Sequence, residues 1–385
     1  MEKAFLLPSP FFDALRSKNR EDGAELIGKT AAYYVEAACR EAGLLLRLDR
    51  DDAWEEQDTV FFISEAAASA APSEYAYLRE ELQEADAAVM SDYYNHPMIV
   101  ALRGASLHKA RAAFASEHTF DGFYGKVEAL FPEMVCVQAD AWCIDDFQTL
   151  SMAEEALRFH INSAHQDRGV RIDFPDQVTI GPEVVIGEGT WIQGSVRIEG
   201  QTTIGADCLI RSNSRIVDST IGDRVRIDSS LIEKSVMEDD SNIGPYSHLR
   251  PNAHLGKAVH IGNFVEVKNA SLGEGTKAGH LAYVGDAEVG SNVNIGCGVI
   301  FVNYDGTYKH RSTVGDRAFI GSNANLVAPV AVEEEAFVAA GSTITKDVAA
   351  GGLSIERAVQ EFHPGYAARK KKRDEAIRQA KKNEQ

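Results

Sequence analysis

The stretch that decides the fold runs from Ile180 to Ile216 and reads IGPEVVIGEGTWIQGSVRIEGQTTIGADCLIRSNSRI. Isoleucine returns every six residues through it, at positions 180, 186, 192, 198, 204, 210 and 216. An α-helix of about 3.6 residues per turn would scatter such a period around its surface. Short strands separated by turns would instead point every isoleucine inward, and three strands would close one triangular coil. Stacked coils share a continuous aliphatic core, so the period predicts a β-solenoid.

The step of six recurs farther along the chain, over Ile243–Val267 and again over Val314–Ile344. From Ile180 to Val348 the repeat corresponds to roughly nine coils. The segment Val302–Thr313 breaks the rhythm, so we expect it to form a loop outside the prism, where binding residues often lie. Steps of five replace the step of six at three places: Ile216 to Ile221, Val267 to Leu272 and Val284 to Val289.

The repeat divides the chain into parts with different expected folds. We expect a helical or reduced α/β domain over 1–135, a connecting helical segment over 136–170, the solenoid over 171–350 and a basic tail over 351–385. Composition and apolar spacing predict helices at Glu25–Leu46, Glu74–Met90, Leu107–Ala115 and, as the connecting helix, Thr149–His165. Short apolar runs predict strands at Val60–Ile63, Met98–Leu102 and Val135–Val137.

The composition is typical of a globular protein, with 385 residues and a net charge of -19. So acidic a chain is a poor partner for nucleic acid, and no apolar run reaches the roughly 18 residues of a membrane span. The first residues lack the features of a signal peptide. Five scattered cysteines fit a reducing compartment, so we expect a cytoplasmic protein. The basic run Arg369–Arg373 is expected to lie on a solvated helix.

A series of motifs in the second half of the chain carries a family resemblance. The motifs are RPNAHLG (250–256), GNFVEVKN (262–269), KAGHLAYVGDAEVG (277–290), NVNIGCG (292–298), VNYDG (302–306), NLVAP (325–329) and AAGSTITKDV (339–348). In order and spacing they resemble the acetyltransferase domain of the bifunctional N-acetylglucosamine-1-phosphate uridyltransferase/glucosamine-1-phosphate acetyltransferase family. The resemblance runs from about Asp145 to about Lys372, roughly 60% of the chain.

This resemblance implies a left-handed parallel β-helix, although parallel crossovers are normally right-handed. It implies acetyl-CoA as cosubstrate, the amine of glucosamine-1-phosphate as acceptor, and no metal for acetyl transfer. The product would serve UDP-N-acetylglucosamine synthesis, and the active sites would form between neighbouring chains of a homotrimer. Two alternatives stay open. The acceptor would be another, nucleotide-linked amino sugar, or the chain would be a catalytically silent trimeric scaffold that recruits a partner uridyltransferase.

Acetyl transfer to an amine requires a base near neutral pKa, cations for the sugar phosphate and a groove for the CoA arm. His280 matches the family's general base, and Asn303 matches a residue at the reacting amine. The remaining matches fall into two groups. Positions that match substrate-binding residues are Arg250, Lys268, Tyr283 and Asn294, and Lys309 in the external loop could reach either the sugar phosphate or CoA. Positions that match acetyl-CoA contacts are Cys297, Tyr304, Ser322, Ala340 and Arg357.

Spacing supports one pair of these residues independently. Arg250 and Lys268 are 18 residues apart, so the repeat places them on the same face of adjacent coils. A guanidinium beside an ammonium suits a grip on phosphate. Their alternative interpretation is a pair of solvated surface cations.

Two rival chemistries are weaker. Cys297 could act as a nucleophile and form an acyl-enzyme, but direct attack by the amine needs no such intermediate. Three histidines stand six residues apart: His248, His254 and His260. Because one step of six moves to the next face of the prism, these side chains should diverge, so we do not expect them to share a metal ion.

The N-terminal region departs from the family. The family's nucleotidyltransferase domain opens with a glycine-rich loop and a basic residue that cradle nucleotide phosphates. Residues 1–30 contain only Gly23 and Gly28, in a charged context. We therefore predict that uridyl transfer is absent.

Overall fold

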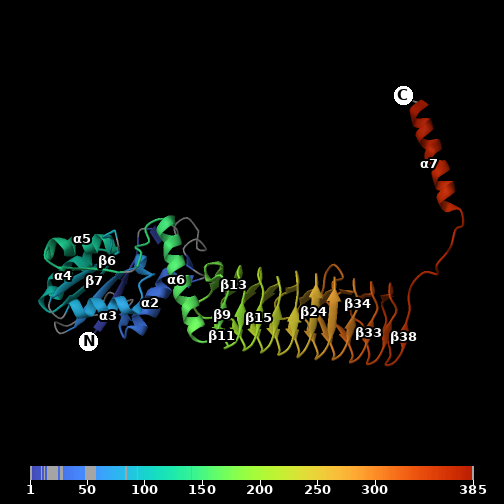
Figure 1. The fold of residues 1–385 in the computed structure, drawn as a ribbon, viewed down its shortest axis with the longest axis horizontal. Coiled ribbons are helices and arrows are strands. Elements are labelled where there is room, and N and C mark those ends of the chain that lie inside the picture. The colour runs from blue at the N-terminus through green and yellow to red at the C-terminus, as the bar shows by residue number, and fades with distance from the viewer. Residues whose placement is uncertain are drawn as a thin grey trace.

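The computed structural model describes residues 2–9, 11–12, 14, 25–26, 29–47, 58–82, 85–92, 94–139 and 141–383. An α/β domain occupies one end of the molecule, a long solenoid extends from it, and a helix stands off the far end (Figure 1). Among the described residues, no helix is both long and apolar enough to span a membrane.

The described part of the N-terminal domain is built on a six-stranded sheet in the order β4-β1-β5-β7-β6-β8. Strand β7 runs antiparallel to β5 and β6, whereas the other neighbours are parallel. The strands are β1 (Glu2–Leu7), β4 (Leu45–Arg47), β5 (Thr59–Ser64), β6 (Ala87–Ser91), β7 (Pro97–Arg103) and β8 (Val135–Gln138); a short hairpin, β2 (Glu25–Leu26) and β3 (Lys29–Thr30), lies apart from them.

Helices cover both faces of this sheet. Alternation along β5 sends Phe61 and Ile63 to one core and Val60 and Phe62 to the other, because successive strand side chains point to opposite faces. The first core includes α2 (Ala31–Glu41) and α3 (Pro72–Glu81), and the second includes α4 (Ala105–Ser116) and α5 (Phe120–Leu130). A short 3-10 turn, η2 (Glu65–Ala67), follows β5.

The predicted strands at Val60–Ile63, Met98–Leu102 and Val135–Val137 are confirmed, as is the helix at Leu107–Ala115. Two helix predictions are wrong at their ends. Of the described residues in Glu25–Leu46, only α2 is helical, and it stops before Gly43, which adopts the left-handed conformation. The segment Glu74–Met90 ends its helix at Glu81, and Ala87–Ser91 forms β6, because burial of the whole strand overrides the helix propensity of alanine.

A single helix, α6 (Phe147–Asp167), joins the two domains and confirms the predicted connecting helix. Asp146 caps its first turn by accepting a hydrogen bond from the Thr149 N–H at 2.7 Å. Ile161 packs against both the N-terminal and the solenoid cores. Nearby, Asn162 Nδ2 donates to the carbonyls of Pro175 (2.8 Å) and Val178 (3.0 Å). These contacts fix the first coil to the helix.

Within residues 141–383 the chain builds three parallel sheets, which form the three faces of a prism of about ten turns. The chain passes from sheet I to sheet II to sheet III in every coil. Sheet I has ten strands: β10 (Val178–Ile180), β13 (Val196–Glu199), β16 (Arg215–Val217), β19 (Leu231–Glu233), β22 (His248–Leu249), β25 (Glu266–Lys268), β28 (Tyr283–Gly285), β31 (Ile300–Val302), β34 (Asn325–Val327) and β37 (Thr343–Ile344).

Sheets II and III repeat the same pattern within this described segment. Sheet II has nine strands: β11 (Val185–Ile186), β14 (Thr203–Ile204), β17 (Thr220–Ile221), β20 (Val236–Met237), β23 (His254–Leu255), β26 (Ser271–Leu272), β29 (Ala287–Val289), β32 (Ser312–Val314) and β35 (Ala331–Val332). Sheet III has eleven strands: β9 (Arg171–Ile172), β12 (Trp191–Ile192), β15 (Leu209–Ile210), β18 (Arg226–Ile227), β21 (Asn242–Ile243), β24 (His260–Asn263), β27 (Lys277–His280), β30 (Asn294–Ile295), β33 (Phe319–Ile320), β36 (Phe337–Val338) and β38 (Leu353–Ser354). A 3-10 turn, η3 (Pro175–Gln177), precedes the first complete coil.

The repeated aliphatic residues form ladders inside the prism, as the sequence predicts. Ile180 pairs with Ile198, which pairs with Ile216, and all three side chains are fully buried. Each such burial contributes about 1.5–3 kcal/mol relative to an exposed side chain. The predicted external loop is confirmed between β31 and β32, where Tyr304 and Lys309 form an isolated bridge.

The chain ends in α7 (Tyr366–Asn383), which stands away from the prism in Figure 1. Residues Arg369–Arg373 lie on its first turns and are exposed, which confirms the predicted solvated basic helix.

Candidate active site

Two of the predicted cations meet where sheet I turns into sheet II, which we call the I–II corner. Leu249 pairs with Val267, so the residues that follow them, Arg250 and Lys268, occupy equivalent positions in adjacent coils. The Arg250 guanidinium is held by Glu266 Oε1 at 2.8 Å, and it remains partly exposed. The predicted placement of these two cations on the same face of adjacent coils is thus confirmed.

The external loop brings a third cation to this corner. The side-chain amine of Lys309 lies near that of Lys268 and lowers the pKa of Lys268, and desolvation lowers it further. Lys309 itself is exposed on the loop. Arg250, Lys268 and Lys309 therefore form a positive cluster open to solvent, which suits a phosphate group.

Asn303 and Tyr283 lie beside these cations. Asn303 Nδ2 donates to the Tyr283 hydroxyl at 3.3 Å and also to Asp286 Oδ2. The next loop residue, Tyr304, is 55% exposed, and its hydroxyl donates to the Gly306 carbonyl at 2.6 Å. Tyr304, a predicted acetyl-CoA contact, thus lies at the I–II corner. The other predicted acetyl-CoA contacts lie at a different corner, described below.

Asp305 gives the loop its shape. Its Oδ1 accepts the backbone N–H groups of Thr307 and Tyr308, both at 2.7 Å, and its Oδ2 lies 2.8 Å from His310 Nε2. These hydrogen bonds, led by that from Tyr308, lower the pKa of Asp305 to about 2. A carboxylate with three donors keeps a short loop in one conformation, and so places Lys309 reproducibly.

His280 lies at a different corner, where sheet III turns into sheet I. Its Nδ1 is 2.9 Å from Asn263 Oδ1, one coil earlier, and its ring is exposed. The two coils approach closely here, since a Cβ on Gly262 would overlap the backbone of Gly279. Glycine at position 262 allows that approach, which brings Asn263 beside His280.

Most of the predicted acetyl-CoA residues continue along this III–I corner. The strand register places Cys297, Ser322 and Ala340 on successive coils after His280, and all three are exposed. Arg357 Nη1 then donates to the Ala340 carbonyl at 3.1 Å, beyond the last complete coil. Small side chains in one line, from His280 to a terminal cation, form a strip that an extended CoA arm can follow.

Asn294 is not brought together with either group. It lies on the outer face of sheet III, in register with Lys277 and Phe319, and is exposed. The three histidines of the rejected metal site lie in three different sheets, at His248, His254 and His260, as the spacing predicts.

The III–I corner lies where the strands of sheet I begin, and the I–II corner lies where they end. Between His280 and Asp286 the chain crosses that sheet as β28, and at about 3.3 Å per residue the crossing spans roughly 15–20 Å. This separation exceeds hydrogen-bond reach several-fold. Within one copy of the chain, His280 and the Lys268–Lys309 pair therefore belong to different corners of the prism.

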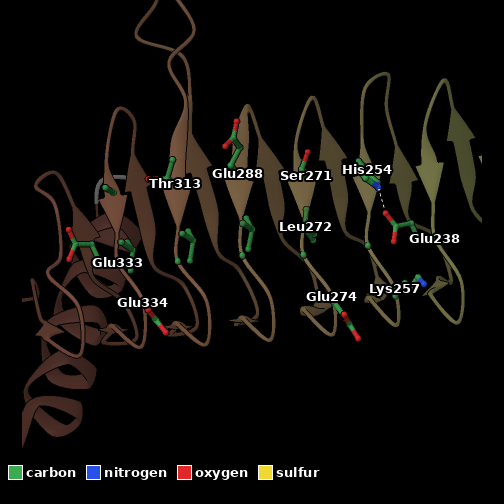
Figure 2. Close-up of a pocket in the computed structure, with 18 residues that line it drawn as sticks. Glu238, His254, Lys257, Ser271, Leu272, Glu274, Glu288, Thr313, Glu333 and Glu334 are labelled. Atoms are coloured by element: carbon green, nitrogen blue, oxygen red, sulfur yellow. Dashed lines mark hydrogen bonds and ion pairs between the residues drawn. The ribbon is translucent and has the colours of Figure 1, made fainter.

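A broad hollow lies elsewhere, on sheet II, with a volume of about 980 Å³. Figure 2 shows acidic side chains around it, including Glu274, Glu288, Glu333 and Glu334. Its lining includes none of the predicted site residues, all of which the structure describes. Its negative charge does not suit a sugar phosphate.

Three residues of the candidate site were not predicted: Asn263, Asn269 and Asp286. Each stands 17 residues from its partner, because the steps of five at Val267–Leu272 and Val284–Val289 shorten these coils by one residue. Those steps were visible in the sequence and could have revealed the pairs.

Comparisons with known proteins agree with the hexapeptide-repeat solenoid. The family described as "Bacterial transferase hexapeptide (six repeats)" matches residues 183–217, and "Hexapeptide repeat of succinyl-transferase" matches residues 312–346. The bifunctional protein GlmU of Clostridioides difficile (strain 630) is 51% identical over 226 residues, which cover 59% of this chain and 49% of that protein. The chain is a homologue of GlmU.

Another GlmU, from Pediococcus pentosaceus, is 51% identical over 240 residues, covering 62% of this chain and 51% of that protein. The match thus spans about half the length of these GlmU proteins. Among solved structures, a UDP-N-acetylglucosamine acyltransferase of Francisella novicida is 18% identical and covers 48% of this chain and 66% of that one, with a TM-score of 0.36. A likeness this distant carries no weight for function.

Proposed function

We propose that this chain is an N-acetyltransferase that moves the acetyl group of acetyl-CoA to the amine of glucosamine-1-phosphate. The product, N-acetylglucosamine-1-phosphate, would enter UDP-N-acetylglucosamine synthesis in the cytoplasm. One observation carries the proposal most directly. The predicted base and most of the acetyl-CoA contacts line one edge of sheet I, and the predicted phosphate cations line the other.

The phosphate binds to Arg250, Lys268 and Lys309, which leaves the adjacent sugar amine near Asn303. The Nδ1–H of His280 donates to Asn263 Oδ1, an assignment that leaves Nε2 with its lone pair. Nε2 takes a proton from the amine as the nitrogen attacks the thioester carbonyl. The carbon–sulfur bond then breaks, and the imidazolium returns the proton to the CoA thiolate. Cys297 takes no covalent part.

The acting unit in this proposal is a homotrimer. Because the two groups lie at opposite edges of sheet I, a neighbouring copy supplies the complementary edge, with its His280 beside the Lys268 of the first copy. A closed ring of such head-to-tail contacts gives every copy the same role, as cyclic symmetry requires.

Uridyl transfer is not part of the proposed activity. The prediction that uridyl transfer is absent rests on residues 1–30. The two glycines in that segment, Gly23 and Gly28, lie outside the described residues. Acetyl transfer, as proposed, gives no part to the described α/β sheet.

A CoA-release assay with glucosamine-1-phosphate, followed by mass determination of the product, tests the proposal. We expect acetylated product from the native chain and a loss of roughly 10²–10⁴-fold in kcat for His280→Ala. If only a nucleotide-linked amino sugar is acetylated, that sugar replaces glucosamine-1-phosphate as the proposed acceptor. No turnover with any amino sugar would leave the scaffold interpretation and refute the enzyme.

A further inference from the structure

A buried carboxylate connects the separate groups of the I–II corner. Asp286 directly follows β28, adopts a positive φ of 48°, and is only 5% exposed. Its N–H donates to the Lys268 carbonyl at 3.0 Å, and its own carbonyl accepts the Ser312 N–H at 3.1 Å. It is too buried to hold a ligand directly, so any effect on substrate must pass through its neighbours.

The two oxygens of Asp286 serve two amides. Oδ1 accepts from Asn269 Nδ2 at 2.5 Å, and Oδ2 accepts from Asn303 Nδ2. The three residues are 17 positions apart in turn and stack on consecutive coils as an Asn–Asp–Asn ladder. The hydrogen bonds therefore run along the prism axis, from coil to coil.

This arrangement decides which way the Asn303 amide faces. An ionised carboxylate only accepts hydrogen bonds, so the amide must turn its nitrogen toward Asp286. The second Nδ2 hydrogen is directed to the Tyr283 hydroxyl, 3.3 Å away. The side-chain oxygen Oδ1 of Asn303 is then the atom left to accept a hydrogen bond from a ligand amine.

Asp286 also balances charge. Burial raises its pKa, but the hydrogen bonds from Asn269 and Asn303, followed by the charges of Lys268 and Lys309, lower it below the ordinary value overall. In return, Asp286 opposes the lowering of the Lys268 pKa that Lys309, desolvation and Arg250 cause. The negative charge of Asp286 thus offsets part of the repulsion between the two ammonium groups.

We infer that Asp286 is a positioning residue for the acetyl acceptor. Its hydrogen bond to Asn303 orients that amide toward the reacting amine, and its charge offsets the repulsion between Lys268 and Lys309. This inference rests on the proposed function of the same site, but it concerns a residue that the family resemblance did not supply.

The test compares Asp286→Asn with Glu288→Gln. Both substitutions neutralise one carboxylate near this corner, but Glu288 points outward from sheet II and contacts only Arg311 among the partners found in the described residues. For Asp286→Asn we expect the KM for glucosamine-1-phosphate to rise about tenfold and kcat to fall about tenfold. We expect the KM for acetyl-CoA to change less than about twofold, and Glu288→Gln to match the native chain.

A second readout needs no turnover. The titration of the Lys268 and Lys309 amines is followed by NMR without substrate, with each signal assigned by substitution to arginine. In Asp286→Asn we expect the lower of the two titrations to move to still lower pH. If the native chain does not acetylate glucosamine-1-phosphate, the proposed function fails, and this titration still decides the role of Asp286.

Two outcomes would overturn the inference. One is a lysine titration unchanged in Asp286→Asn; the other is a lower melting temperature with native kinetics. Should Asp286→Asn not fold, Asp286→Glu replaces it, since the charge is kept and the reach altered. A native lysine titration with reduced kcat then supports the inference, and native kinetics contradict it.

Discussion

His280 Nδ1 lies 2.9 Å from the side-chain carbonyl oxygen of Asn263, and in the proposed reaction that contact leaves Nε2 as the base. We expect Asn263→Ala to lower kcat by about tenfold, because the ring loses its orientation. Asn263→Asp adds a negative charge that favours the imidazolium, so the acidic limb of the pH–rate profile should move to higher pH.

A matched control for this prediction exists on the same sheet. His260 Nδ1 contacts Asn242 Oδ1 at 2.5 Å, one coil before the Asn263 pair. Asn242→Ala should leave kcat and the pH profile at native values. An acidic limb that stays in place in Asn263→Asp would argue against the assigned role of Asn263.

Mixed oligomers provide a test of the shared site. His280→Ala and Lys268→Ala should each be inactive alone. If each site takes His280 from one copy and Lys268 from its neighbour, equal co-refolding should restore about one quarter of native activity, since one neighbour pair in four is intact at both positions. Activity that stays at the level of the separate variants would show that a single chain holds the whole site.

Cys297 tests the order of bond formation. Its thiol is exposed one coil from His280, where a covalent acyl carrier would have to stand. Direct attack by the amine predicts that Cys297→Ala keeps kcat within about twofold, and that mass spectrometry finds no acetyl adduct on the native chain. The exposed Cys136 of the N-terminal domain offers the control substitution Cys136→Ala. A loss of turnover confined to Cys297→Ala would favour the acyl-enzyme.

The junction between the domains should weaken in acid. Desolvation, and to a smaller extent the charge of Arg168, lowers the pKa of buried His165 below 6.5. Below pH 6.5 the unfolded chain therefore binds this proton more readily than the folded chain, so stability falls as pH falls, by at most about 1.4 kcal/mol per pH unit. Melting curves from pH 7.5 to 5.5 should show this trend, and His165→Gln should flatten it. The exposed His160 of the same helix supplies the control, and equal slopes in both variants would refute the assignment.

The solenoid could be predicted from the sequence because each aliphatic residue serves the same purpose in every coil. The ladder from Ile180 to Ile216 needs no tertiary information beyond the repeat itself. The site was harder for a related reason. A fixed spacing of 18 pairs Arg250 with Lys268 correctly, but the 17-residue coils that follow hide Asn263 and Asp286 from the same rule.

Three of the six strands in the described N-terminal sheet, β1, β4 and β6, escaped prediction because they depend on distant partners. The segment Ala87–Ser91 contains good helix formers, yet it is a strand buried between two layers of helices. Strand β1 (Glu2–Leu7) pairs with β4 and β5, which follow it by about 40 to 55 residues, so no local pattern announces it.

The first coils of the prism separate the candidate site from the first complete coil, which follows the α/β domain and α6. From β10 to β22 the chain climbs four coil spacings, about 19 Å at roughly 4.8 Å per coil, before the first cation of the candidate site appears. Nothing released at Arg250 is handed directly to the α/β sheet of the same chain. The proposed reaction therefore releases its product to bulk solvent, so its supply to a reaction at the α/β sheet of the same chain would depend on diffusion and local concentration rather than on a channel.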